Sequence, residues 1–280
     1  MKREGYLHEN FHYFHLKDTA GQERDFHYHE FDKIVILLSG KVVYAVEDQT
    51  YELHPWDVLL VKHHCIHKAI IDQSEYYQRV IVYLDGKYFD RVMPGAGLLS
   101  SFDQADNRCS YRFAPNGQER EELEAILTQY EAAAKDTRPG SSTMQELAIM
   151  GLLVHIKRIV SGQDFQAQTA ETGFDPKIQE ILSYINEHIA QPLTVEELAD
   201  LVYLSKYHFM RLFKAQTGAT VHSYIRQKRL LYSARLIRAG TPVSRAAEEV
   251  GFADYSTFHR AFKECFGIAP GQLRGQKKGG

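Results

Sequence analysis

The chain has 280 residues, of which 44% are hydrophobic and 25% charged, and its net charge of −3 and ordinary composition exclude collagen-like and disordered proteins. It contains no run of ~18 apolar residues that would span a membrane and no signal-peptide core near its start, so we expect a cytoplasmic protein without a membrane partner. Its three cysteines, Cys65, Cys109 and Cys265, lie far apart, which argues against a disulfide framework or a cysteine zinc site.

The first hundred residues predict strands. Short runs rich in Val, Ile and Leu occupy residues 33–39, 41–46, 51–53 and 58–61, and turns with Gly, Asp or Pro separate them. Runs of this length and spacing favour an antiparallel sandwich or barrel. Two helices follow, over about 118–135 and 143–160, where apolar side chains recur at helical spacing. We therefore expect an α+β protein whose first domain is an antiparallel β-barrel followed by two helices.

A polar stretch, residues 163–173, contains few branched apolar residues and ends in glycine, which is typical of a linker. The expected domains are therefore 1–162 and 174–280. From Phe174 onward the chain has 15 Lys and Arg against 10 Asp and Glu, whereas the preceding residues have 18 against 26. A basic second domain suggests an anionic partner.

An internal repeat marks the second domain as all-helical. The segment Phe209–Gly218 recurs 49 residues later as Phe258–Gly267, and each copy follows a residue suited to cap a helix, Ser205 or Asp254. Each copy predicts a short helix, a turn and a longer helix, which is the plan of a helix-turn-helix. A helix over residues 223–238, about 24 Å long, would hold the two longer helices about one DNA turn, ~34 Å, apart.

The longer helices present one face to the core and one to solvent. Their phenylalanines are spaced i, i+4 and face the core, so the opposite face near each N-terminus can meet DNA bases. Arg211 and Arg260 can each donate two hydrogen bonds to guanine, a contact worth about 1–3 kcal/mol of discrimination. The alternative is a helical bundle whose repeat is purely architectural. The expected DNA-contacting residues are Lys206, Tyr207, Met210, Arg211, Lys214, Tyr255, Ser256, His259, Arg260 and Lys263.

These residues resemble the DNA-binding domain of AraC/XylS bacterial transcription regulators. The match covers about residues 175–275 and includes Phe209-x-Arg211-x-Phe213-Lys214 and its repeat, Phe258-x-Arg260-x-Phe262-Lys263. The resemblance implies a sequence-specific regulator, more often an activator than a repressor, with promoter DNA and RNA polymerase as partners and no enzymatic activity. It also implies a homodimer formed through the two helices of the first domain. Their apolar stripe would either contact a partner helix or cover the barrel, and it consists of Leu147, Met150, Leu153 and Val154.

The first domain resembles a cupin, a jelly-roll-like barrel found in sugar-responsive members of the same family. His27-Tyr-His29 and Gly40 have the spacing of the first cupin motif, and the stretch from Trp56 to His67 has that of the second. The resemblance implies a barrel mouth that binds a small polar effector, a sugar or sugar derivative. A lining of histidines and a lysine also suits a carboxylate or phosphate group. The expected ligand-binding residues are His27, His29, Lys33 and His67.

Lys33 departs from the metal-binding cupin pattern. It stands where the third metal ligand, a glutamate, would be, and an ammonium group opposes a divalent cation. We therefore expect no catalytic residue, no metal and no cofactor. Two alternatives stay open: zinc on His27, His29 and His67, in a sensor or an enzyme fused to the DNA-binding domain, or a barrel that only scaffolds a constitutive regulator.

Overall fold

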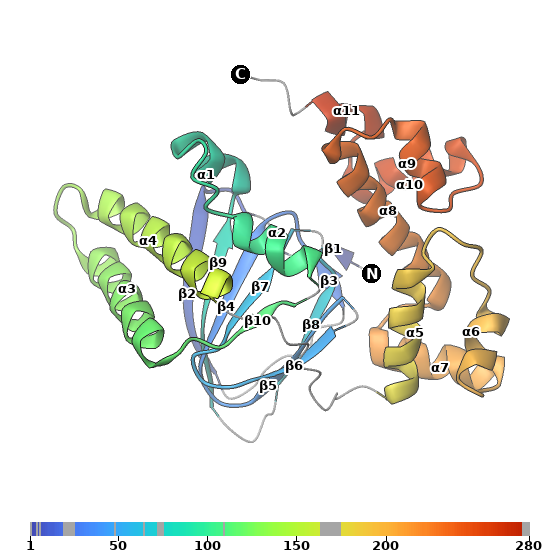
Figure 1. Cartoon of the computed structure of the whole chain (residues 1–280), viewed down its shortest axis with the longest axis horizontal. Coiled ribbons are helices and arrows are strands. Elements are labelled where there is room, and N and C mark those ends of the chain that lie inside the picture. The colour runs from blue at the N-terminus through green and yellow to red at the C-terminus, as the bar shows by residue number, and fades with distance from the viewer. Residues whose placement is uncertain are drawn as a thin grey trace. The chain divides into compact units, whose positions relative to one another are not determined.

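A computed structural model of the chain describes residues 2–3, 5, 7–18, 26–47, 49–63, 65–71, 76–108, 110–162 and 175–275. The chain divides into two compact units (Figure 1). The N-terminal domain consists mainly of residues 3–24 and 28–173, and the C-terminal domain mainly of residues 174–280. The linker expected at 163–173 lies outside the described residues.

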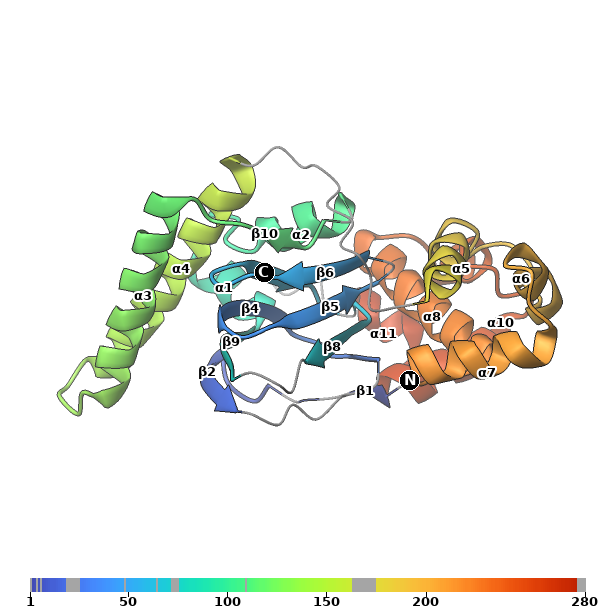
Figure 2. The ribbon, with the colours of Figure 1, turned by 90° about the horizontal axis from the view of Figure 1, so that it is seen from below.

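Two β-sheets of five strands each form the body of the N-terminal domain in the part that the structure describes (Figure 2). One sheet has the strand order β1 (Lys2–Arg3), β3 (His27–Tyr28), β8 (His67–Ile71), β5 (Val42–Val46) and β6 (Gln49–Leu53). The other has the order β10 (Arg112–Phe113), β7 (Val58–Val61), β4 (Asp32–Ser39), β9 (Tyr77–Leu84) and β2 (Phe11–Asp18). The expected α+β class with a cupin-like β domain is confirmed, although the strands form two sheets and not one closed barrel.

Strands β4 and β7 are buried on both faces. Residues 34–37 and 58–61 are almost fully inaccessible to solvent, which explains why their sequences are continuous apolar runs without alternation. One face of this sheet meets the opposite sheet, and helices cover the other. Tyr13 on β2, for example, donates a hydrogen bond of 3.0 Å to Glu131, and its ring stacks on Tyr130 with centroids 4.1 Å apart.

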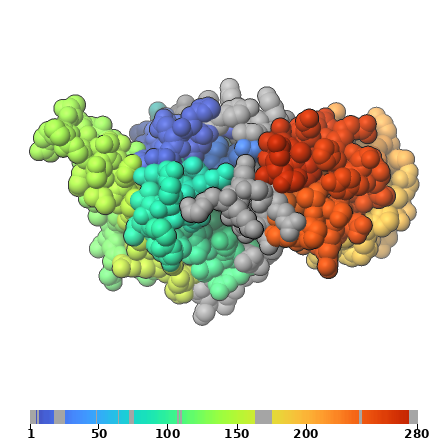
Figure 3. Space-filling model, turned by 90° about the horizontal axis from the view of Figure 1, so that it is seen from above, coloured from blue at the N-terminus to red at the C-terminus, as the bar shows by residue number. Residues whose placement is uncertain are grey.

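The helices of this domain are α1 (Gly86–Val92), α2 (Ser100–Asn107), α3 (Gly117–Lys135) and α4 (Ser141–Gly162). The expected pair corresponds to α3 and α4, whereas α1 and α2 were not expected. Asn116 begins α3 with a capping box, since its side chain accepts from Glu119 N and the Glu119 carboxylate accepts from Asn116 N. Helices α3 and α4 pack side by side as a hairpin, and the end of this hairpin projects from the domain (Figure 3).

The apolar stripe expected on α4 is correct only in part. Leu153 is buried in the domain core and Met150 is half-buried, because both side chains pack against the hydrophobic core. Met144, Leu147 and Val154 are exposed by 44%, 53% and 40%. The exposed stripe of α4 therefore consists of Met144, Leu147 and Val154.

The C-terminal domain is helical throughout the part that the structure describes. Its elements are α5 (Pro176–Glu187), α6 (Val195–Leu201), α7 (Lys206–Thr217), α8 (Val221–Ala239), α9 (Val243–Glu249), α10 (Tyr255–Phe266) and α11 (Pro270–Gly275). Helices α6 and α7 form one helix-turn-helix unit and α9 and α10 the other. Helix α8 joins them and contacts α7, α9, α10 and α11. Gly218 and Gly267 end α7 and α10 in the left-handed conformation that glycine adopts without strain.

Candidate functional site

The first helix-turn-helix unit is fixed by local caps and by two buried rings. Thr194 and Glu197 form a capping box at the start of α6, and the Ser205 hydroxyl accepts from His208 N at the start of α7. Phe209 and Phe213 are fully buried. These contacts fix the rotation of α7 about its axis and therefore decide which side chains face solvent.

The exposed face of α7 carries every DNA-contacting residue expected in the first copy. These residues are Lys206, Tyr207, Met210, Arg211 and Lys214. Lys206 also forms an ion pair with Glu196 on α6, and this hydrogen bond holds the pKa of Glu196 below its usual range. The ion pair is solvent-exposed, so Lys206 can exchange it for a phosphate contact at little cost.

The second unit repeats this arrangement. The Asp254 carboxylate accepts from Thr257 N at the start of α10, which lowers the pKa of Asp254, while Phe258 and Phe262 are buried. Tyr255, Ser256, Arg260 and Lys263 are exposed. His259 is half-buried, with its ring centroid 6.1 Å from that of Tyr255, so it has less surface to offer than the other four.

The β domain contains a cluster of polar side chains between its two sheets. Lys33 of β4 directs its ammonium group to His67 of β8, with 3.5 Å between Nζ and Nε2. The His29 ring lies 4.7 Å from the His67 ring, centroid to centroid, and stacks on Phe31. Lys33, His67 and His29 are only 7%, 0% and 2% exposed. The structure therefore brings together three of the four expected ligand-binding residues.

His27, the fourth, is buried on β3. In the other two histidines, Nδ1 donates to a backbone carbonyl, of Phe31 for His29 and of Cys65 for His67. This tautomer leaves Nε2 as the acceptor, and at His67 the Lys33 ammonium occupies that position. A divalent cation would have to displace Lys33 there, so these residues do not fit the zinc alternative.

Three further inward-facing residues were missed by the sequence analysis. Lys33 lies over the Tyr44 ring at 5.9 Å, and the Tyr44 hydroxyl is 3.4 Å from that of Tyr77. The Arg79 guanidinium lies over the Tyr77 ring at 4.1 Å. Tyr77 and Arg79 share the face of β9 that carries Tyr83, the partner of Lys33 in the sheet register. The signal in the sequence was the alternation of residues 77, 79, 81 and 83, which has meaning only once the strand pairing is known.

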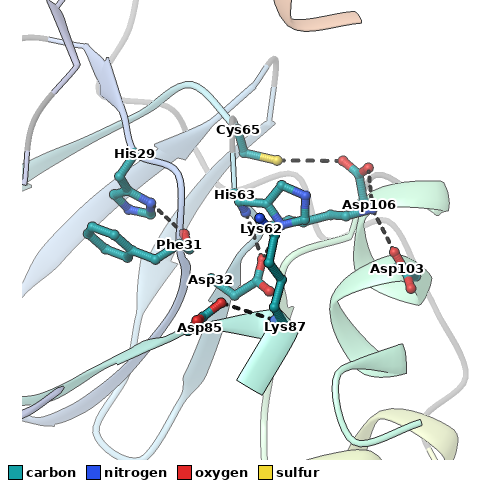
Figure 4. A network of polar contacts seen from close by, with 10 residues as sticks. All are labelled: His29, Phe31, Asp32, Lys62, His63, Cys65, Asp85, Lys87, Asp103 and Asp106. Atoms are coloured by element: carbon teal, nitrogen blue, oxygen red, sulfur yellow. Dashed lines mark hydrogen bonds and ion pairs between the residues drawn. The ribbon is translucent and has the colours of Figure 1, made fainter. Parts of the chain in front are cut away.

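The loop that leads into His67 is anchored to the surrounding elements (Figure 4). Lys62 pairs with Asp103 of α2 at 2.6 Å and with Asp106 at 3.5 Å. His63 donates through its backbone N to Asp32 and places Nδ1 2.7 Å from the same carboxylate. Cys65 donates its thiol to Asp106 at 3.5 Å. These contacts fix His67 in the polar cluster and connect it to α2, which packs on α4.

Within the ranges that the structure describes, no group of three or more His, Cys, Asp or Glu side chains is arranged to hold a metal ion. None of the described helices is both long and apolar enough to cross a membrane.

Two helix-turn-helix units on one long helix, together with a β domain that encloses a polar cluster, define a two-domain DNA-binding protein with a separate ligand-binding domain. Residues 12–153, just over half of the chain, match the family described as AraC-like ligand binding domain, and residues 198–276 match a helix-turn-helix domain. The chain therefore belongs to the AraC family of transcription regulators.

Curated relatives agree with this assignment. The chain is 25% identical over 249 residues to the HTH-type transcriptional activator RhaS of Klebsiella pneumoniae, covering 89% of this chain and 86% of that protein. It is 25% identical over 257 residues to the probable transcriptional regulator LumQ of Photobacterium leiognathi, covering 90% and 93%. The regulatory protein SoxS of Escherichia coli is 36% identical over 98 residues, which are 35% of this chain and 92% of SoxS.

Proposed function

We propose that this AraC-family regulator reads promoter DNA with α7 and α10 and that a small anionic effector in the polar cluster controls the reading. The effector we infer is a sugar derivative with a carboxylate or phosphate group. The choice of an anionic effector is supported by two cations, Lys33 and Arg79, on inward-facing positions of β4 and β9. Two imidazoles and two tyrosine hydroxyls lie in the same cluster. Charge-assisted hydrogen bonds to an anion are about twice as strong as neutral ones.

The DNA-reading residues divide by role. Arg211 and Arg260 lie in the N-terminal half of their helices, where a guanidinium can donate to guanine O6 and N7. Lys214 and Lys263 lie one turn further on and suit phosphate oxygens, which carry no sequence information. Arg211 and Arg260 therefore supply specificity and the two lysines supply affinity.

Two single substitutions test this division. Arg260→Ala should weaken binding to a duplex selected by the wild-type chain by about 1–3 kcal/mol and relax one base position. Lys214→Ala should weaken selected and random duplexes by the same factor and reduce the dependence of affinity on salt. Fluorescence anisotropy with both duplexes at several salt concentrations measures these effects. Equal losses of Arg260→Ala on selected and random DNA would remove Arg260 from the base-reading set.

Activation is the expected sign of regulation, with RNA polymerase as the protein partner, and the support for this is the name of RhaS as a transcriptional activator. The relatives named as transcriptional regulators also support action by binding and not by catalysis.

The chain acts as a homodimer through the exposed stripe of α4. Met144, Leu147 and Val154 follow one another by three and seven residues, so they lie along one side of the helix, and a Cβ added at Gly151 between them would meet no atom within 4 Å. An exposed apolar row next to a small residue suits close contact with the same row of a second copy. Two chains would then present four recognition helices to one promoter, and linked binding would raise affinity.

A further inference from the structure

A single arginine connects three separate parts of the C-terminal domain. Arg229, near the middle of α8, donates from Nε to Ile189 O at 2.9 Å and from Nη2 to Gln191 O at 2.6 Å, and both carbonyls lie between α5 and α6. Its Nη1 donates to Gly251 O at 2.8 Å, in the turn between α9 and α10. One guanidinium therefore ties the linking helix to the segment that leads into the first helix-turn-helix unit and to the turn of the second unit.

Gly251 allows the turn between α9 and α10 to lie close to Arg229 and to the backbone of Ala190. Its φ of +82° is one that side-chain-bearing residues rarely adopt, and an added Cβ would lie 2.6 Å from Ala190 O and 3.0 Å from Arg229 Cζ. At Gly251 the turn of the second unit thus approaches the backbone between α5 and α6 more closely than a residue with a side chain would allow. Arg229 and Gly251 together form what we call the joint.

The joint lies where the two units leave space between them. A cleft of about 370 Å³ adjoins it, with Leu193 just before α6, Phe252 from the second unit and Ile225 from α8 among its walls. Helix α8 contacts α7 of the first unit and both α9 and α10 of the second. The hydrogen bonds of Arg229 and the close approach of Gly251 are therefore well placed to fix the angle of one unit relative to the other.

We propose that the joint determines the spacing of DNA sites that this protein accepts. The proposal rests on the proposed function, in which α7 and α10 enter successive major grooves. One inserted base pair moves the second site by about 3.4 Å and turns it by about 34–36° around the DNA axis. Units held at a fixed angle cannot follow this displacement, whereas units released at the joint can.

The test uses the full chain and the duplex that the wild type selects from a randomised pool. A second duplex carries one extra base pair between the two contacted segments. Arg229→Gln and Gly251→Ala each disrupt the joint from a different side. Arg245→Gln is the matched control, because it removes the same charge from the second unit, whereas Arg245 pairs with Glu249 of its own helix, at side-chain exposures of 72% and 39%.

The measured quantity is the ratio of affinities for the two duplexes, which does not depend on the fraction of active protein. The affinity of the wild type and of Arg245→Gln should fall about 10- to 100-fold on insertion, because one unit forfeits its base contacts. The affinity of Arg229→Gln and of Gly251→Ala should fall less than about threefold when the base pair is inserted. If both joint variants show the same ratio of affinities for the two duplexes as the wild type, the proposal is overturned.

A folding defect in a variant can be distinguished from a failure of the proposed function. If Arg229→Gln shows no cooperative thermal transition, Arg229→Lys replaces it, since lysine keeps the charge but cannot reach all three carbonyls. An unchanged ratio in Arg229→Lys together with Gly251→Ala also overturns the proposal. A wild-type chain that selects no sequence contradicts the proposed function itself, which is a different result from a wild-type spacing ratio in the variants.

Discussion

Lys33 illustrates how one residue redirects the chemistry of a site. In place of a carboxylate it brings an ammonium group to within 3.5 Å of His67 Nε2, in a position that is 7% exposed. A buried cation favours an anionic ligand and disfavours a metal ion. The polar cluster is therefore better suited to a sugar acid or sugar phosphate than to a neutral sugar.

Replacing Lys33 tests the effector class. A matching sugar acid or sugar phosphate at about 100 times its dissociation constant should stabilise the wild-type chain by ~2.7 kcal/mol, a shift of several degrees in Tm. Lys33→Met keeps the length of the side chain but removes a charged hydrogen bond worth about 1.5–3 kcal/mol, so the affinity should fall about 10- to 100-fold. Thermal-shift titration of the full chain measures both the stabilisation by the effector and the fall in affinity.

Lys41→Met is the control, because Lys41 is an exposed lysine on the turn before β5. It should respond to the effector as the wild type does. A wild-type chain that responds to zinc but to no anionic sugar, or a Lys33→Met chain with undiminished affinity, would contradict the assignment of the cluster.

Helix α4 carries the proposed dimer interface. Ile149, Leu152 and Ile156 face the domain core, whereas Leu147 and Val154 face solvent, so the helix is apolar on more than one side. A helix of this kind is expected to be covered on its second side.

Leu147→Glu tests this expectation. A charge at the centre of the stripe should weaken self-association at least about tenfold, because a carboxylate would be buried without a partner. Sedimentation velocity over a range of concentrations should show a dimer for the wild type and a monomer for Leu147→Glu. Val92→Glu, at a residue on α1 that is 42% exposed, should remain dimeric. Dimeric Leu147→Glu would exclude this face as the interface.

The elements that the sequence predicted well are those with local signals. Ser205 and Asp254 cap α7 and α10 as expected, and the core phenylalanines fix which residues are exposed, so the candidate DNA-reading set followed from spacing alone. The polar cluster was predicted less completely. Arg79 and Tyr44 come from different sheets, and only the strand register places both on inward faces. The short helices α1 and α2 have too few turns to establish a period.

In the proposed mechanism, effector binding in the β domain and DNA binding in the helical domain depend on one equilibrium between two arrangements of the whole chain. The effector must bind one arrangement of the chain more tightly than another, since a ligand with equal affinity for both changes nothing. In the β domain, contacts run from His67 through the preceding loop to α2, and from α2 to α4. Through these contacts, effector binding can shift α4 in the proposed dimer interface. Such a shift would change how the recognition helices of two chains are placed on DNA.

The most direct test of the central claim is dimethyl sulfate protection of guanine N7 on the selected duplex, because N7 faces the major groove. We predict protected guanines in two groups whose centres are about 10 base pairs apart. Arg211→Ala should remove the protection of one guanine in one group, and Arg260→Ala that of one guanine in the other. A single protected group, or loss of both groups in either variant, would contradict the conclusion that α7 and α10 read two successive major grooves.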